Sequence, residues 1–265
     1  MDAYVPQRAD VGRLSAAAAR MALVAMTAIS GVACAADALC SNEQTAAIAA
    51  QLHYDSSQFH QRACKALPHM PGYAAVALAF RDDPSEANGA PIDGDYDLDL
   101  LIVRQDGSIL RRLRLKQVIE SDAMRFSSLS IDTGRYTIAP GARAVGVRVS
   151  HANSSRSNGY SSQALMLFVD DGATLRQVLT RLEVSKESGE WDLQCVGAFE
   201  SIKRAIDVGP DTSHGLRDLI VTTTVVDSVN AGVAGDCKTT EHKPVVSRQT
   251  VRYDGHVYAV PANLK

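Results

Sequence analysis

Four aspartates at alternate positions have the spacing in this chain that most directly suggests chemistry. Asp93, Asp95, Asp97 and Asp99 lie in the stretch DGDYDLD, immediately before an apolar segment. Ca²⁺ takes about six to eight oxygen ligands in flexible geometry, so carboxylates repeated along a loop are suited to bind it. The stretch departs from an EF-hand loop, because its Gly is misplaced and no Glu follows at the twelfth position. We favour a hydrated acidic turn and keep a calcium site as the alternative.

The cysteines indicate structural bridges. Cys34 lies within an expected export signal, where it is either removed or modified by lipid, which leaves Cys40, Cys64, Cys195 and Cys237. An even number of cysteines in an exported chain is typical of disulfides, and four cysteines allow three connectivities. We favour Cys40–Cys64 with Cys195–Cys237, because each bridge then closes a shorter loop. The absence of a C-x-x-C spacing means that neither a redox dithiol nor a zinc knuckle is expected.

A polar segment in the middle of the chain is the best candidate for recognition. Residues 151–162, HANSSRSNGYSS, predict a long exposed loop, a common location for binding residues. Within it, Asn153, Arg156, Asn158 and Tyr160 are the candidate binding residues. Tyr combined with Ser, Asn and Gly provides adaptable contacts at low entropic cost. The alternative is a flexible, solvated loop without a ligand.

Catalytic signatures do not stand out. Neither G-x-S-x-G nor S-x-x-K occurs in a convincing context after the expected signal, and the seven histidines include no H-E-x-x-H spacing. We therefore expect a protein that is not an enzyme. A hydrolase whose site is assembled from distant residues stays open, because such sites are recognised by geometry.

The composition is that of a folded domain, with 46% hydrophobic and 22% charged residues. Its net charge is −3 and the basic residues are scattered, so nucleic acid is not an expected partner.

Arg8, Arg13 and Arg20 precede an apolar run at residues 21–32 and small residues at 33–35, which predicts a signal peptide over residues 1–35. This run is too short to span a bilayer, so we expect no transmembrane segment in the mature chain. The predicted location is periplasmic or secreted, and lipid anchoring at Cys34 is the less favoured alternative.

Residues 36–72 predict a helical N-terminal segment. Ser41 and Gln44 have the spacing of a capping box, and an alanine-rich run follows them. A second short helix is expected over residues 58–67, with Phe59, Ala63 and Leu67 on one face. The prolines at positions 68 and 71 then end helical structure.

Residues 73–265 predict a mainly β domain. Three pairs of apolar runs are joined through Asp-Gly, at positions 106–107, 171–172 and 254–255. Asp-Gly tolerates the positive φ that tight hairpin turns require, so each pair predicts an antiparallel hairpin. The spacing between the pairs is too irregular for a solenoid. Further strands are expected at residues 136–138, 144–149, 219–226 and 243–250, which favours a sandwich- or propeller-like arrangement.

Two of the hairpins, LMLFVDDGATLRQVL and QTVRYDGHVYAV, resemble hairpins of exported bacterial β-rich proteins that have no assigned function. The resemblance covers about a fifth of the chain and marks hairpins alone. It implies an exported, β-rich protein and carries no functional residue.

These features together predict an exported periplasmic or envelope binding protein. Its expected partner is another envelope or secreted protein, for which it would serve as an inhibitor or immunity partner. The alternatives are a calcium-stabilised structural or adhesion-type module and the hydrolase with a non-sequential site. No cofactor is expected apart from Ca²⁺ in the first of these alternatives.

Overall fold

The computed structural model describes residues 40–54, 59–81, 94–233 and 236–265 as an antiparallel, mainly β protein with one short N-terminal α-helix. The expected signal peptide and Cys34 lie outside these residues. The helix and the first strands are α2 (Asn42–Gln51), β1 (Phe59–Ala66), β2 (Tyr73–Phe80), β3 (Tyr96–Arg104), β4 (Ile109–Ile119), β5 (Arg125–Asp132), β6 (Thr137–Ala139) and β7 (Ala142–Arg143). The remaining elements are β8 (Val145–Ala152), β9 (Tyr160–Asp170), β10 (Leu175–Trp191), β11 (Gly197–Ser213), β12 (Leu216–Val233), β13 (Asp236–Glu241), β14 (Val245–Val251) and the 3₁₀ turn η3 (Ala262–Leu264).

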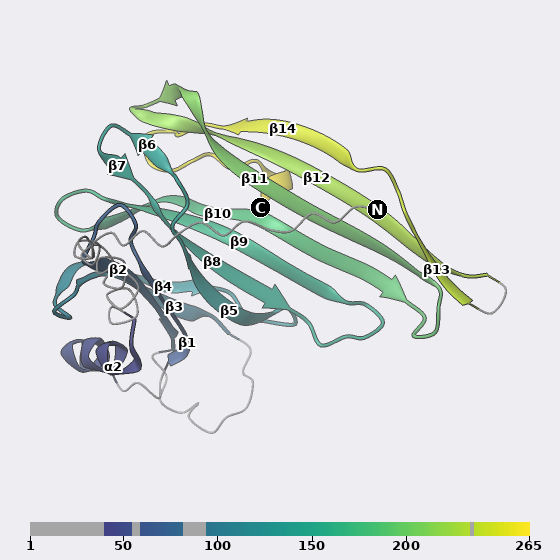
Figure 1. Ribbon diagram of the computed structural model, residues 1–265, viewed down its shortest axis with the longest axis horizontal. Coiled ribbons are helices and arrows are strands. Elements are labelled where there is room, and N and C mark those ends of the chain that lie inside the picture. Colours follow the sequence, from purple (N-terminus) through teal and green to yellow (C-terminus); the bar gives the residue numbers. More distant parts are fainter. Residues whose placement is uncertain (1–39, 55–58, 82–93, 234–235) are drawn as a thin grey trace, which may run out of the picture.

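Two sheets form the body of the protein (Figure 1). The first has four strands in the order β1-β2-β3-β4. The second has eight strands, in the order β13-β12-β11-β10-β9-β8-β5, with β14 also paired to β12. The short strands β6 and β7 pair with each other in a separate two-stranded sheet. Most connections are hairpins between strands adjacent in sequence, as the repeated turn signals predict.

The first sheet packs face to face on part of the second, which is a sandwich arrangement. Their shared core joins alternate residues of β2 and β3 to residues of β5, β8 and β9. The apolar run of β2 is buried on both faces. Its small residues Ala75, Ala77 and Ala79 face the second sheet, whereas Val76 and Leu78 pack with Ile48 of α2. The helix therefore covers the outer face of the first sheet, as Figure 1 shows.

A separate core lies on the second sheet, beneath the end of the chain. It combines residues from β9, β10 and β12 with the β6 region and the C-terminal segment: Leu165, Leu167, Leu179, Leu182, Leu219, Val221, Tyr136, Ile138, Tyr258 and Leu264. The backbone N–H of Tyr258 donates to the carbonyl of Val178, at 2.8 Å. The C-terminal segment thus attaches directly to β10 and leaves the far ends of the long strands uncovered.

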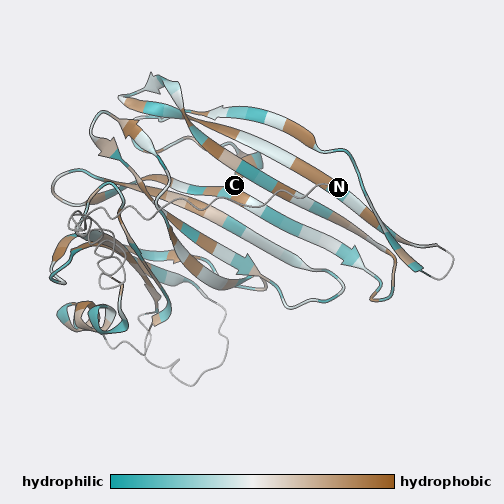
Figure 2. Cartoon of the chain, in the orientation of Figure 1, coloured by the Kyte–Doolittle hydropathy of each residue, from teal (hydrophilic) through white to brown (hydrophobic). Residues whose placement is uncertain are grey.

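The long strands give the molecule its extended shape. Strands β10 and β11 have 17 residues each and β12 has 18, so all three reach well past the packed region (Figure 1). Hydrophobic and polar residues are mixed along these projecting ends (Figure 2).

Two disulfides brace the fold. Cys40–Cys64 ties the start of the described chain to β1, and Cys195–Cys237 ties the β10–β11 turn to β13. This pairing confirms the connectivity that we favoured from the sequence because each bridge closes a shorter loop.

Several sequence expectations hold in the structure. The hairpins β3–β4 and β9–β10 form as predicted. Their turns contain Gly107 and Gly172, with φ of +82° and +92°, a region that an L residue rarely adopts. At the third Asp-Gly, the pairing is reduced to a single bridge between Tyr253 and Tyr258.

Other expectations were wrong. Residues 59–66 form strand β1 paired with β2, not a second helix. Phe59, Ala63 and Leu67 are four apart, which places them on one face of a strand as well as of a helix, so this spacing could not discriminate. The predicted long loop at residues 151–162 is also shorter, because β8 extends to Ala152 and β9 begins at Tyr160.

Candidate functional site

A groove of about 590 Å³ lies at the projecting ends of strands β9–β12, beyond the sandwich core. We refer to it as the distal groove. It is lined by Met124, Asn153, Asn158, Gly159, Tyr160, Ser188, Gly189, Glu190, Ala198, Phe199, Glu200, Asp227, Ser228 and Val229. Three of the four predicted binding residues therefore line one cavity, and Arg156 is exposed nearby without lining it.

Strand register builds the floor of the groove. Tyr160 of β9 pairs with Ser188 of β10, Ser188 pairs with Glu200 of β11, and Glu200 pairs with Asp227 of β12. Residues directly opposite each other in an antiparallel sheet project to the same face. These four side chains consequently form one row across four neighbouring strands.

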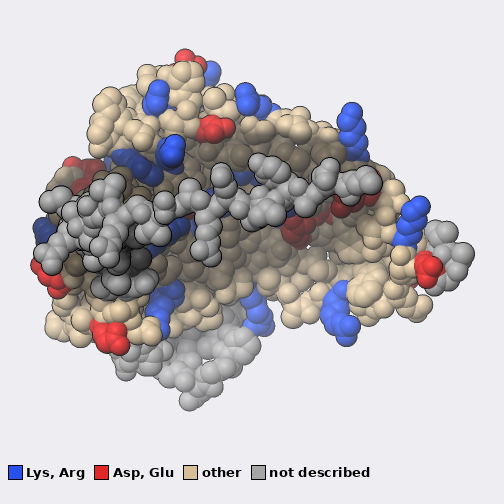
Figure 3. All heavy atoms as spheres, in the orientation of Figure 1, with Lys and Arg blue, Asp and Glu red and all other residues tan. Residues whose placement is uncertain are grey.

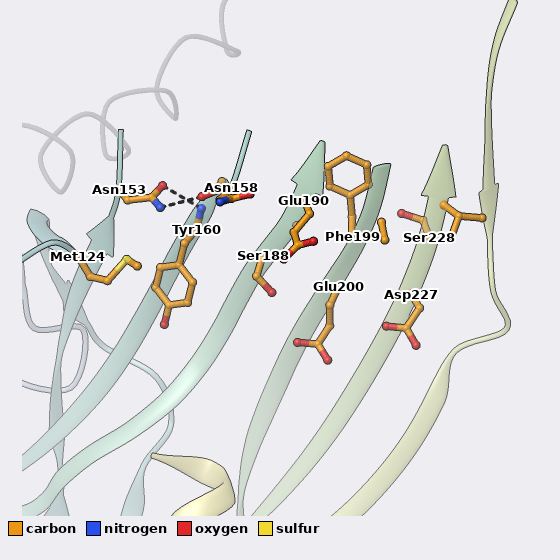
Figure 4. A pocket seen from close by; sticks show the side chains of 14 residues that line it. Met124, Asn153, Asn158, Tyr160, Ser188, Glu190, Phe199, Glu200, Asp227 and Ser228 are labelled. Carbon is orange, nitrogen blue, oxygen red and sulfur yellow. Dashed lines mark hydrogen bonds between the residues drawn. The ribbon is translucent and has the colours of Figure 1, made fainter. Parts of the chain in front are cut away.

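The close view confirms this arrangement (Figure 4). Tyr160, Glu200 and Asp227 project to one side of the sheet, and Phe199 projects to the other side. A Cβ at Gly189 would meet the Phe199 ring and would lie 2.9 Å from the carbonyl oxygen of Ala198. Gly189 therefore allows the aromatic ring to lie flat against the backbone of the neighbouring strand.

A hydrogen-bonded turn, spanning residues 153–159, forms one end of the groove. The Asn153 side chain donates to the carbonyl of Asn158 at 2.8 Å and accepts from the backbone N–H of Tyr160 at 3.0 Å. The backbone N–H of Asn158 donates to Ser155 Oγ at 2.9 Å. These bonds hold the turn closed and fix the direction in which Tyr160 enters β9. In place of the long exposed loop that was predicted, the segment is a short turn closed by hydrogen bonds.

The groove combines acidic and apolar groups. Glu190, Glu200 and Asp227 supply three carboxyl groups. Lys186 forms an ion pair with Glu200 at 2.8 Å, and this hydrogen bond raises the pKa of Lys186. Glu190 and Asp227 have no ion-pair partner among the residues that the structure describes. Acidic side chains also show on the hollowed face of the long strands in Figure 3.

Two exposed apolar side chains add hydrophobic surface at opposite sides of the groove. Met124 is 36% exposed and Val229 is 38% exposed. An isolated exposed apolar residue needs no explanation, but two that flank one cavity supply contact area for a ligand. The arrangement therefore suits a partner that carries both apolar and positively charged groups.

The aspartate run occupies a different part of the molecule. Asp93 lies outside the described residues and Asp95 is exposed. Asp97 and Asp99 are buried in β3, where their carboxylates bind Arg114 at 2.7 Å and Arg112 at 2.6 Å. Both carboxylates lie on one face of the strand, and guanidinium groups balance their charge. The hydrated acidic turn that we favoured is therefore wrong for these two aspartates, which are buried in a strand.

The Tyr54 hydroxyl, just after α2, completes this network. It donates to Asp99 Oδ2 at 3.1 Å and accepts from Arg112 at 2.9 Å and from Arg114 at 3.1 Å. Burial, followed by the charge of Asp99, raises the pKa of Tyr54. The network ties the helix to β3 and β4.

No group of three or more His, Cys, Asp or Glu side chains suited to a metal ion occurs in the described part of the chain. Calcium binding stays a prediction.

The histidines form no hydrogen-bonded pair with a serine or cysteine in the described ranges. His60, His151 and His214 each bond a backbone carbonyl oxygen, of Phe126, Glu120 and Tyr253 respectively. Burial lowers the pKa of His151. Within the same ranges, no helix is long and apolar enough to cross a membrane.

Sequence reasoning missed the floor of the groove. No strand was expected over residues 185–191 or 197–213, which belong to β10 and β11. The stretch AFESIK gave no local signal, because Phe199 and Ile202 are separated by two polar residues and so do not alternate as in a half-buried strand. Strand pairing alone brings these residues beside Tyr160.

Comparison of the chain with protein-family models, with the curated proteins and with the solved structures finds no match. Function is therefore inferred from the geometry of the groove.

Proposed function

We propose that this is a binding protein of an oxidising compartment and that the distal groove is its recognition surface. The observation that carries the proposal is the row formed by Tyr160, Ser188, Glu200 and Asp227, aligned across four strands next to a structured turn. The two disulfides support an oxidising location, since they persist outside reducing compartments. One of them, Cys195–Cys237, braces the strand ends that carry the groove.

The shape of the groove favours a polypeptide partner. Strands in a sheet lie about 4.8 Å apart, so the row from β9 to β12 spans about 14 Å. Glu190, Asp227 and Val229 on its floor are all exposed. A small-molecule site typically buries about 70–90% of its ligand, whereas this open floor covers one side. A segment of another envelope or secreted protein fits this shape.

Charge indicates the chemistry of that segment. Glu190 and Asp227 present carboxylates that are not balanced within the described residues, beside the apolar surface of Met124, Tyr160 and Val229. A segment with Lys or Arg next to an apolar side chain complements both features. Complementary charges also speed association and select against wrong partners. An inhibitor or immunity role follows if the bound segment belongs to a secreted enzyme or toxin.

A capture experiment with matched variants tests the proposal. The oxidised protein is used as bait in envelope extract, in three forms: wild type, Asp227→Asn and Glu187→Gln. Both variants remove one negative charge, but Glu187 is adjacent to Ser188 and projects to the opposite face, where it accepts from Ser201 at 2.7 Å.

We expect one protein to be enriched by the wild type and by Glu187→Gln, and to be depleted at least fivefold with Asp227→Asn. The residues that contribute most to an interface each cost more than about 1 kcal/mol when they are lost, and 1 kcal/mol corresponds to about fivefold in affinity. Equal capture by all three forms, or no specific capture by the wild type, contradicts the proposal.

A further inference from the structure

A second cavity, of about 380 Å³, lies at the opposite end of the long strands from the distal groove. We call it the turn cavity. It is lined by Arg176, His214, Gly215, Leu216, Tyr253, Gly255 and His256. None of these residues belongs to the distal groove, so a function for the turn cavity is independent of the function proposed above.

Two tight turns form the walls of the turn cavity. The β11–β12 turn has His214 at φ +49° and Gly215 at φ +85°, which is the left-handed pair of a type I′ hairpin. The second turn contains Gly255 at φ +104°, and a Cβ there would lie 3.8 Å from the His214 ring. The two turns therefore lie against each other through the imidazole.

Hydrogen bonds fix the His214 ring in this position. Its Nδ1 lies 3.0 Å from the carbonyl oxygen of Tyr253. A carbonyl can only accept, so Nδ1 carries the hydrogen and Nε2 is the nitrogen left for another contact. When the ring is protonated, Nε2 also becomes a donor.

Tyr253 has an unused donor at the cavity. The residue is only 4% exposed, and its hydroxyl oxygen accepts from Arg176 Nη1 at 2.6 Å. No acceptor for the hydroxyl hydrogen of Tyr253 is present among the described residues. A buried polar group normally has its hydrogen bonds satisfied, so this donor calls for an acceptor from outside the chain.

Basic and neutral side chains line the cavity, and carboxylates lie around it. Arg176, His214 and His256 are the basic residues of the lining. Asp218, two residues after Leu216, is buried, with one oxygen 3.7 Å from Arg252 and the other without a partner among the described residues. Two further carboxylates bind turn amides. Asp254 accepts from the backbone N–H of His256 at 2.8 Å, and Asp171 accepts from that of Thr174 at 2.8 Å. These bonds lower the pKa of both aspartates.

We propose that the turn cavity binds a small oxyanion, either a phosphate or a carboxylate group. The guanidinium of Arg176 and the hydroxyl of Tyr253 are its donors, and Nε2 of His214 is a third donor only in the protonated ring. Arg presents a planar set of N–H groups that matches two oxygens of such an anion, and charge-assisted hydrogen bonds are the stronger class. The cavity is large enough for the anionic group and a few attached atoms.

Titration by NMR tests the proposal. Inorganic phosphate and sodium acetate are added separately to the oxidised protein, with sodium chloride at the same ionic strength as the reference. The backbone amides of Gly215 and Gly255 report directly on the two turns, and glycine amides are readily recognised. We expect saturable shifts of both signals with one of the two oxyanions and no saturable shift with chloride. The more tightly bound anion identifies the class of ligand.

Matched variants locate the site. Tyr253→Phe keeps the ring and removes only the hydroxyl, and Arg176→Gln removes the guanidinium. Each should weaken binding about tenfold, the effect of losing one charge-assisted hydrogen bond. His214→Asn is a further test, because Asn tolerates the positive φ of this turn. Lys238→Gln, on exposed β13, controls for a general loss of positive charge and should leave the affinity unchanged.

Two results would overturn the proposal. One is that neither phosphate nor acetate shifts the glycine amides beyond the chloride reference. The other is that Tyr253→Phe and Arg176→Gln, with their amide spectra otherwise preserved, bind the anion as tightly as the wild type.

Discussion

Replacing Asp99 by Asn should destabilise the protein markedly, because Asp99 is the buried centre of the network that joins α2 to the first sheet. Its side chain is fully buried, and its carboxylate binds Arg112 at 2.6 Å and Tyr54 at 3.1 Å. Asn keeps the shape and one oxygen acceptor but loses the charge. The Arg112 guanidinium is then left without its counter-charge.

The magnitude follows from burial. Breaking a buried ion pair from one side typically costs about 3–5 kcal/mol. The Arg112 side chain is 37% exposed, so water recovers part of this loss. We expect a decrease of about 2 kcal/mol in the free energy of unfolding, or about 4–8 °C in melting temperature for a domain of this size. Asp95→Asn is the matched control, because Asp95 is exposed and its substitution should change stability by less than about 0.5 kcal/mol.

The assay is thermal unfolding of the wild type and both variants, each with and without EDTA. The ion-pair interpretation predicts a large shift for Asp99→Asn, a negligible shift for Asp95→Asn and no effect of EDTA. Equal melting temperatures for the two variants would refute it. If calcium were bound, EDTA would lower the melting temperature of the wild type and Asp95→Asn would do the same, since a ligand of the folded state stabilises it.

Three further predictions address other parts of the fold. Replacing Cys195 and Cys237 together by Ser removes a bridge across 42 residues. In a chain-entropy model this loss lowers the free energy of unfolding by about 4 kcal/mol, and hydrogen exchange should rise first in β13. Burial lowers the pKa of His151, so the unfolded chain binds a proton more readily than the folded protein. The free energy of unfolding should therefore fall as the pH drops below about 6.5. His151→Gln should reduce this acid sensitivity in thermal melts measured across pH. Gly189→Ala should cost about 1–3 kcal/mol in chemical denaturation, because the new methyl group meets the Phe199 ring; an unchanged midpoint would contradict the packing described for this glycine.

Sequence signals predicted the elements that are determined by residues close together in the chain. The N-cap of α2 is Ser41, whose side chain accepts from the backbone N–H of Gln44 at 3.2 Å, as the capping-box spacing indicated. Two Asp-Gly turns produced hairpins because Gly provides the positive φ that such turns need. The mainly β, antiparallel character followed from these turns and from the apolar runs between them.

The candidate site could be predicted only in part, since it depends on pairing between distant residues. The polar stretch pointed to Asn153, Asn158 and Tyr160 from composition alone. The acidic residues opposite them, Glu200 and Asp227, lie about 40 and 70 residues further along the chain and meet Tyr160 only through strand register. Likewise, the aspartate run could not reveal that arginines on the next strand would balance it.

Site-specific crosslinking tests the central claim most directly. A photoreactive phenylalanine analogue is placed at Val229 in the distal groove or at Val246 of β14, an exposed valine that pairs with Thr224 and therefore projects to the opposite face of the sheet. Both proteins are irradiated in envelope extract, and the products are identified by mass spectrometry. Recognition through the distal groove predicts a defined crosslinked protein from position 229 and none from position 246. The same product from both positions, or from position 246 alone, would contradict it.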